Sequence, residues 1–160
     1  MRLRDVELGD VEAYTRMRCD PAMMAELGGP LPAETIPDKV ARDVETVAAN
    51  EGWIKMIVTN EDEVAGSVVL WSHEEDGRLI SEMGWMVLPE HQGRGVATWA
   101  AGALLALARK DGRWGPVHAF PGVENGASNG VCRSLGFRLL EECDVVFAGR
   151  TLRTNHWVAE

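Results

Sequence analysis

Cysteine is scarce in this 160-residue chain, which has three: Cys19, Cys132 and Cys143. An odd number does not suit a disulfide framework, and no two of them have the Cys-x-x-Cys spacing of a zinc site. We therefore expect free thiols, no metal, and the reducing cytoplasm as the compartment.

Positive charge is also scarce, because 16 Lys and Arg residues face 25 Asp and Glu residues, which gives a net charge of −9. Nucleic acid is not an expected partner, since phosphate binding is driven by Lys and Arg. The acidity fits a cationic substrate such as an amine, although solubility alone explains it as well.

Long apolar runs are missing. Residues 1–5 lack the apolar core of a signal peptide, and residues 97–108, the longest apolar stretch, are too short and too rich in Ala and Gly to span a bilayer. We expect neither a signal peptide nor a membrane partner.

What the chain does have is the balance of a globular protein, with 46% hydrophobic and 26% charged residues. Its length suits a single domain spanning residues 1–160. Hydrophobic periodicity predicts the order β-α-α-β-β-β-α-β-α-β-β, a mixed α/β (α+β) domain with a mixed sheet. Two helices are predicted after the caps Asp10 and Thr35, and two more over residues 97–110 and 128–135. The predicted strands are residues 3–7, 53–59, 64–71, 80–88, 116–120, 137–147 and 151–158.

Residues 84–98 join a predicted strand to a predicted helix through a loop that contains Gly93 and Gly95. The first turn of a helix has unpaired N–H groups and the positive end of the macrodipole. Glycines there let phosphates approach the backbone, and Arg94 adds a positive charge. The loop is a candidate pyrophosphate site, with an ordinary strand-to-helix turn as the alternative. It is neither a P-loop nor the three-glycine dinucleotide fingerprint.

Two motifs carry a family resemblance. Residues 92–97, Gln-Gly-Arg-Gly-Val-Ala, resemble the acetyl-CoA signature Arg/Gln-x-x-Gly-x-Gly/Ala of the GNAT superfamily of N-acetyltransferases. Residues 125–137 resemble the later Asn-x-x-Ser-x-x-Val-x-x-x-Leu-Gly-Phe helix of that family. The motifs stand in the family's order and the predicted elements fit, so the resemblance covers nearly the whole chain. The chain looks most like the branch of ribosomal-protein N-terminal (alanine/serine) acetyltransferases.

The resemblance implies the GNAT acyl-CoA N-acyltransferase fold. In that fold the third strand of the meander splays from the next strand, and the cosubstrate acetyl-CoA lies in the gap. Its pantetheine arm would pair with backbone groups of Met86 and Leu88, with Val87 between them. Asn125 and Asn129 would bind pantetheine amides, with helix capping as an equal alternative for Asn125. The residues implied around the pyrophosphate are Gln92, Gly93, Arg94, Gly95, Val96, Ala97 and Thr98.

The implied reaction is direct attack of an uncharged amine on the thioester in a ternary complex, with backbone N–H groups stabilising the oxyanion. Glu82 is the candidate general base, because even spacing puts it on the same face of the strand as Met86, and many family members have a carboxylate there. The alternative for Glu82 is a solvated strand-edge residue. Cys132 stands where many members have a Tyr that acts as the general acid for the departing thiolate, and we expect Cys132 to pack against Phe137. Ser134 or water is left as the acid.

The acceptor is left open by the resemblance: a protein N-terminus, a lysine, a polyamine or a small-molecule amine. A homodimer is expected from family habit alone. The alternative function is a catalytically silent module that senses acetyl-CoA or docks to a partner. The missing Tyr favours that alternative, and the carboxylate of Glu82 opposes it.

Overall fold

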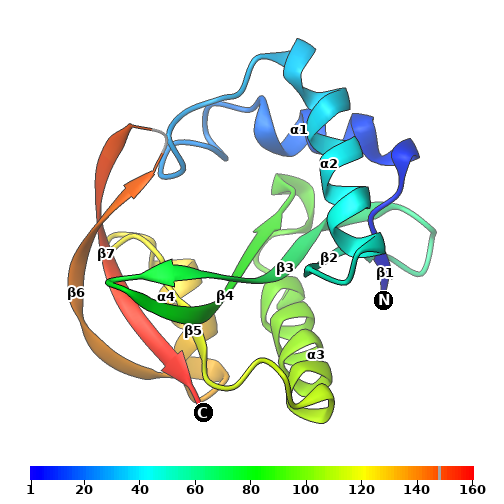
Figure 1. The fold of residues 1–160 in the computed structure, drawn as a ribbon. Helices are drawn as coiled ribbons and strands as arrows, with labels where there is room; N and C mark the ends of the chain where they lie inside the picture. Colours follow the sequence, from blue (N-terminus) through cyan, green and yellow to red (C-terminus); the bar gives the residue numbers. More distant parts are fainter. Residues whose placement is uncertain (148) are drawn as a thin grey trace.

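A computed structural model describes residues 1–147 and 149–160 of the chain. Its strands form one mixed sheet in the order β1-β2-β3-β4-β5-β7-β6 (Figure 1). This confirms the predicted mixed α/β class. The strands are β1 (Arg2–Asp5), β2 (Gly52–Val58), β3 (Val64–Glu75), β4 (Arg78–Val87), β5 (Val117–Ala119), β6 (Arg138–Phe147) and β7 (Arg150–Ala159).

The α-helices follow the predicted order, and short 3-10 turns precede three of them. No helix among the described residues is long and apolar enough to cross a membrane. The helices are α1 (Val11–Arg18), α2 (Ile36–Ala48), α3 (Val96–Asp111) and α4 (Gly126–Ser134), and the 3-10 turns are η1 (Leu8–Asp10), η2 (Ala33–Thr35) and η3 (Pro89–His91).

The hairpin between β3 and β4 is longer than predicted. The polar residues 73–78 were expected to form a turn, but β3 continues to Glu75 and β4 begins at Arg78. Only Asp76 and Gly77 turn the chain, with φ values of +50° and +75°. Two positive φ values suit a tight two-residue hairpin, whose twist matches that of its strands. The extension places His73 inside the sheet.

Side chains from the sheet enter a separate core on each face, because successive residues of a strand point to opposite sides. In β2, Ile57 packs in the cluster that includes α3 and α4, whereas Met56 and Val58 pack in the cluster with α1 and α2. Figure 1 shows α1 and α2 on one side of the strands and α3 on the other. The sheet therefore forms the middle layer.

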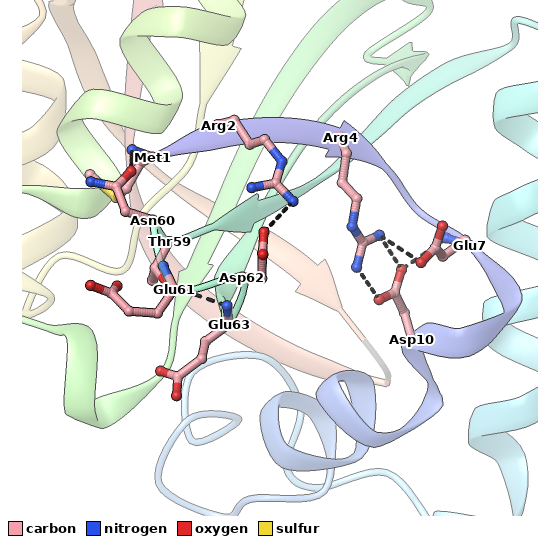
Figure 2. A network of polar contacts seen from close by, with 10 residues as sticks. All are labelled: Met1, Arg2, Arg4, Glu7, Asp10, Thr59, Asn60, Glu61, Asp62 and Glu63. Atoms are coloured by element: carbon pink, nitrogen blue, oxygen red, sulfur yellow. Dashed lines mark hydrogen bonds and ion pairs between the residues drawn. The ribbon is translucent and has the colours of Figure 1, made fainter.

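Asp10 was expected to cap α1 through its side chain, and the structure gives that carboxylate other partners. Its oxygens accept from Arg4 Nη1 at 2.9 Å and Nη2 at 2.7 Å, and from the Glu7 N–H at 2.8 Å. Asp10 is only 4% exposed. The bidentate pair in Figure 2 therefore ties β1 to the start of α1.

Candidate active site

The sheet splits between β4 and β5. These parallel strands are in register at only two pairs, Ser81↔Val117 and Glu82↔His118. Beyond Glu82, β4 continues to Val87 beside β3 alone. The edge of β4 that faces away from β3 therefore has backbone groups without a strand partner, and a cleft of about 1210 Å³ opens beside it.

The glycine loop that leads from β4 into α3 lines this cleft. Gly93 and Gly95 have φ values of +72° and +75°, a conformation that favours glycine over other residues. No side-chain cap is bonded to the first turn of α3 in the described chain. The N–H groups at Val96, Ala97 and Thr98 are thus available to an anion at the positive end of the helix.

Most of the residues expected to bind the cofactor line this one cleft. The Gln92 amide also donates from Nε2 to the Val87 carbonyl at 2.9 Å, which closes the loop onto the end of β4. Arg94 is exposed and lies outside the lining. The expected residues that line the cleft are Glu82, Met86, Val87, Gln92, Gly93, Gly95, Val96, Ala97, Thr98 and Asn125.

Leu88 differs from the expectation that its backbone would face the cofactor. Its N–H donates to the Ala65 carbonyl at 2.8 Å, and its carbonyl accepts from the His91 N–H at 2.9 Å. Both backbone groups are therefore occupied. Alternation along the strand also turns the backbone groups of Met86 towards β3, contrary to the expectation, so that Met86 contributes its side chain to the cleft. The backbone groups that face the gap are those of Trp85 and the N–H of Val87, because the Val87 carbonyl accepts from Gln92.

Asn129 also differs from the expectation of a cofactor contact. Its Nδ2 donates to the carbonyls of Gly122 at 2.9 Å and Asn125 at 2.8 Å. Its Oδ1 accepts from Asn155 Nδ2 and Trp157 Nε1, both at 2.9 Å. Asn129 is 2% exposed and lies outside the cleft lining, so it joins α4, the loop before it and β7.

Asn125 caps α4 and lines the cleft at the same time. Its Oδ1 accepts from the Ser128 N–H at 3.1 Å. The capping alternative is thus present in the structure, and it leaves the Asn125 Nδ2 group free to donate.

The expected acid Ser134 lies at the exposed end of α4, outside the cleft lining. Cys132 is fully buried, and burial raises the pKa of its thiol to about 12. It belongs to the same core cluster as Phe137, as expected. The α4 hydroxyl that does line the cleft is Ser128, whose Oγ accepts from Trp85 Nε1 at 3.2 Å.

Glu82 lies at the point where the sheet splits, with its side chain 21% exposed. Its Oε1 is 2.8 Å from Nε2 of His73, whose Nδ1 lies 3.2 Å from the Glu74 carbonyl. Burial raises the pKa of Glu82, and the hydrogen bond to His73 opposes that rise. Burial lowers the pKa of His73, but the bonds to Glu82 and Glu74 outweigh it and raise that pKa overall.

The sequence-based reasoning missed the histidines around Glu82. His73 was assigned to a turn, although alternation across a longer hairpin could have placed it in β3. His118 is the β5 partner of Glu82 in the sheet register, and its Nδ1 lies 2.7 Å from Nε2 of His156. Burial lowers the pKa of both imidazoles of that pair, and Phe120 stacks on His156. No short sequence spacing links these residues.

The split sheet, the uncapped helix and the half-buried carboxylate together define a site for group transfer from a phosphate-bearing cosubstrate to a nucleophile. The family model described as the acetyltransferase (GNAT) domain matches residues 1–138. The chain therefore belongs to the GNAT acetyltransferases, as its motifs indicated. No curated protein matches its sequence.

Solved structures share the fold across almost the whole chain. A GNAT-family acetyltransferase from Bacillus anthracis has a TM-score of 0.81 and 22% identity, over 98% of this chain and 92% of that one. An acetyltransferase from Salmonella typhimurium that modifies the N-terminal serine of ribosomal protein L7/L12 has a TM-score of 0.82 and 19% identity, over 98% and 92%. A further Salmonella typhimurium protein, solved with its cofactor acetyl-CoA, has a TM-score of 0.78 and 20% identity, over 99% of this chain and 92% of that one.

Proposed function

We propose that this chain transfers an acetyl group from acetyl-CoA to a primary amine, by direct attack in a ternary complex. The observation that carries the proposal is the cleft where β4 leaves β5. The uncapped start of α3 lines that cleft, and Glu82 lines it where the strands separate. A helix start that would bind phosphate and a carboxylate that would act as the base therefore share one cavity.

The residues of the cleft suit acetyl-CoA, which supplies an activated thioester. The amides of Val96, Ala97 and Thr98, with Gly93 and Gly95 allowing close approach, would hold its pyrophosphate. The unpaired edge of β4 would hydrogen-bond the pantetheine arm. A fold neighbour from Salmonella typhimurium contains acetyl-CoA, which supports this assignment.

Glu82 would remove the proton that the attacking amine must lose. An amine is mostly protonated at neutral pH, so a base must accept that proton directly or through water. His73 holds the carboxylate in place by its 2.8 Å contact and offers a route for the proton towards solvent. The N–H groups of β4 that face the gap would stabilise the oxyanion. Ser128 or water would protonate the departing thiolate.

A Glu82→Gln variant tests the proposal because it keeps the shape of the side chain and removes the base. We expect turnover to fall about 10²- to 10⁴-fold, the usual contribution of a general base, with acetyl-CoA affinity unchanged. Thiol release across an amine panel measures the first quantity and calorimetric titration with acetyl-CoA the second. Glu61→Gln, in the exposed turn after β2, is the matched control.

Two outcomes would contradict this function. Failure to bind acetyl-CoA would remove the cofactor assignment. Binding without transfer to any amine would favour the alternative, a silent acetyl-CoA sensor, to which the absence of the family's usual Tyr on α4 also points. A single domain acting in the cytoplasm, as a homodimer, completes the proposal.

A further inference from the structure

Two cationic side chains line the cleft on the side of α1 and α2. Arg18 is the last residue of α1, and Lys39 lies in the first turn of α2. Both are half-buried, and both line the same cleft as Glu82. The proposed catalytic chemistry uses neither of them.

The carboxylate nearest to these cations is already shared. Asp43 accepts a hydrogen bond from the Tyr14 hydroxyl at 2.6 Å, and the Lys39 ammonium is 3.8 Å from it. Within the described part of the chain, the Arg18 guanidinium has no hydrogen bond and no ion pair within 4 Å. One carboxylate therefore faces two cations and a phenol, which leaves an excess of positive charge at the wall of the cleft.

This excess is costly in the free protein. Burial lowers the pKa of Arg18 and of Lys39, because it takes the charged groups out of water without full compensation. Asp43 opposes that effect in both cases, but only in part. A guanidinium has five donors in a fork that matches a carboxylate or phosphonate, so a bound anion would satisfy it.

The other carboxylates that line the cleft leave this demand unmet. Glu26 lies against Gly122, because a Cβ added to that glycine would be 3.0 Å from Oε2 of Glu26. Glu124 is in the loop before α4. Neither forms an ion pair with Arg18 or Lys39 in the described structure. The walls between are mostly apolar, and they include Met23, Leu27, Trp71, Phe120, Phe147 and Leu152.

We infer that the acceptor is a small amino-acid-like amine, whose anionic group is bound by Arg18 and Lys39 and whose amine is presented to Glu82. The inference rests on the proposed acetyl transfer and narrows its acceptor. A polyamine fits poorly, because it would bring further positive charge to two cations that lack a full partner. The apolar walls favour an apolar body between the two polar ends of the acceptor.

The test compares amines that differ only in the carboxylate. L-Leucine is paired with isopentylamine, and L-phenylalanine with 2-phenylethylamine. A third pair, 4-aminobutyrate and propylamine, varies the distance between the amine and the carboxylate. In the preferred pair, we expect kcat/KM to be at least about tenfold higher for the amine that has the carboxylate than for the one that lacks it, as for a charge-assisted bidentate contact. Spermidine and a short peptide with a free N-terminus complete the panel.

Variants assign that preference to the two cations. Arg18→Gln and Lys39→Gln should each lower the ratio of kcat/KM between the paired amines about tenfold. Arg42→Gln, an exposed cation on α2, should leave the ratio unchanged. Melting temperature and acetyl-CoA affinity show whether each variant is folded, and Lys39→Gln carries the test if Arg18→Gln is not.

Three results would overturn the inference. The paired amines could react equally, or spermidine or the peptide could be preferred, and in both cases acetyl transfer itself would stand. The ratio could also survive in both variants, which would place the anion elsewhere. Bound acetyl-CoA without transfer to any amine overturns the proposed function, and the inference with it.

Discussion

Glu82 and His73 form the titratable pair on which the proposed reaction depends. Glu82 is half-buried at the end of the β4–β5 pairing, and His73 reaches it from the neighbouring strand β3. Burial raises the pKa of Glu82, and the His73 imidazole limits that rise because it stabilises the carboxylate. The histidine thus keeps the base ionised at lower pH.

Replacing His73 should move the pH dependence of the reaction. Glu82 accepts a proton only when ionised, so the rate falls as the pH drops through its pKa. In His73→Asn the stabilising contact weakens, the pKa of Glu82 rises, and the acid limb of kcat/KM against pH shifts to higher pH. Steady-state rates across a pH series with acetyl-CoA and one accepted amine measure the shift.

His156→Asn is the control for that shift, because no described contact joins His156 to Glu82. The acid limb of kcat/KM against pH for His156→Asn should coincide with that of the wild type. An unshifted acid limb in His73→Asn, with a merely lower rate at every pH, would mean that His73 holds the strand in place without tuning the base.

The strands β3 and β4 are held close by a glycine that lies opposite the last residue of β4. Gly66 lies opposite Val87, and a Cβ there would be 2.1 Å from the Met86 carbonyl oxygen and 3.0 Å from the Val87 Cα. Both are backbone atoms, which cannot rotate away. The missing side chain therefore sets the position of the strand that lines the cleft.

A Gly66→Ala variant should shift β4 and disturb the cofactor site. We expect a loss of about 1 to 3 kcal/mol in the free energy of unfolding, as for other overpacked interiors, and about tenfold weaker acetyl-CoA binding. Urea unfolding and calorimetry measure the two effects. Gly130→Ala in α4, where nothing lies within 4 Å of the added Cβ, should be neutral or slightly stabilising. Equal behaviour of the two variants would show that the strands yield freely.

The two parts of the sheet, β1 to β4 and β5 to β7, are hydrogen-bonded to each other along a short seam. Between β4 and β5 the sheet has two register pairs, whereas β3 and β4 have ten. Beyond the seam, Asn129 fastens α4 to β7 and the preceding loop. Residues of both parts line the cleft beside the seam, so a ligand bound there adds contacts between them.

Acetyl-CoA should stabilise the protein and protect that seam in particular. At a concentration about 100 times the Kd, binding adds about 2.7 kcal/mol to the free energy of unfolding. Amide hydrogen exchange should slow at Trp85, Val87, Ala97 and Thr98 upon binding, since those groups face the proposed cofactor. The edge strand β1, none of whose residues line the cleft, should exchange as before. Protection concentrated on β1 instead would place the ligand elsewhere.

Local patterns were enough to predict the order of the elements and the glycine loop before α3. Apolar periods of 2 and 3.6 separate strands from helices, and they predicted the sheet and its helices in the right order. The glycines at 93 and 95 identified the loop before α3 because a positive φ and a helix start are local properties. Glu82 was chosen by its alternation with Met86 on one strand.

The tertiary structure decided which polar groups remain free. Leu88 and Asn129 were expected to contact the ligand, but other residues already use their hydrogen-bonding groups. The partners of Leu88 are Ala65 and His91, and those of Asn129 include Gly122 and the more distant Trp157. The same pairing of remote strands and helices brings His73 to Glu82, and it gives the Arg18 guanidinium no hydrogen bond or ion pair among the described residues. The sequence alone determines periodicity and local backbone preference, whereas hydrogen-bond satisfaction depends on neighbours that only folding brings together.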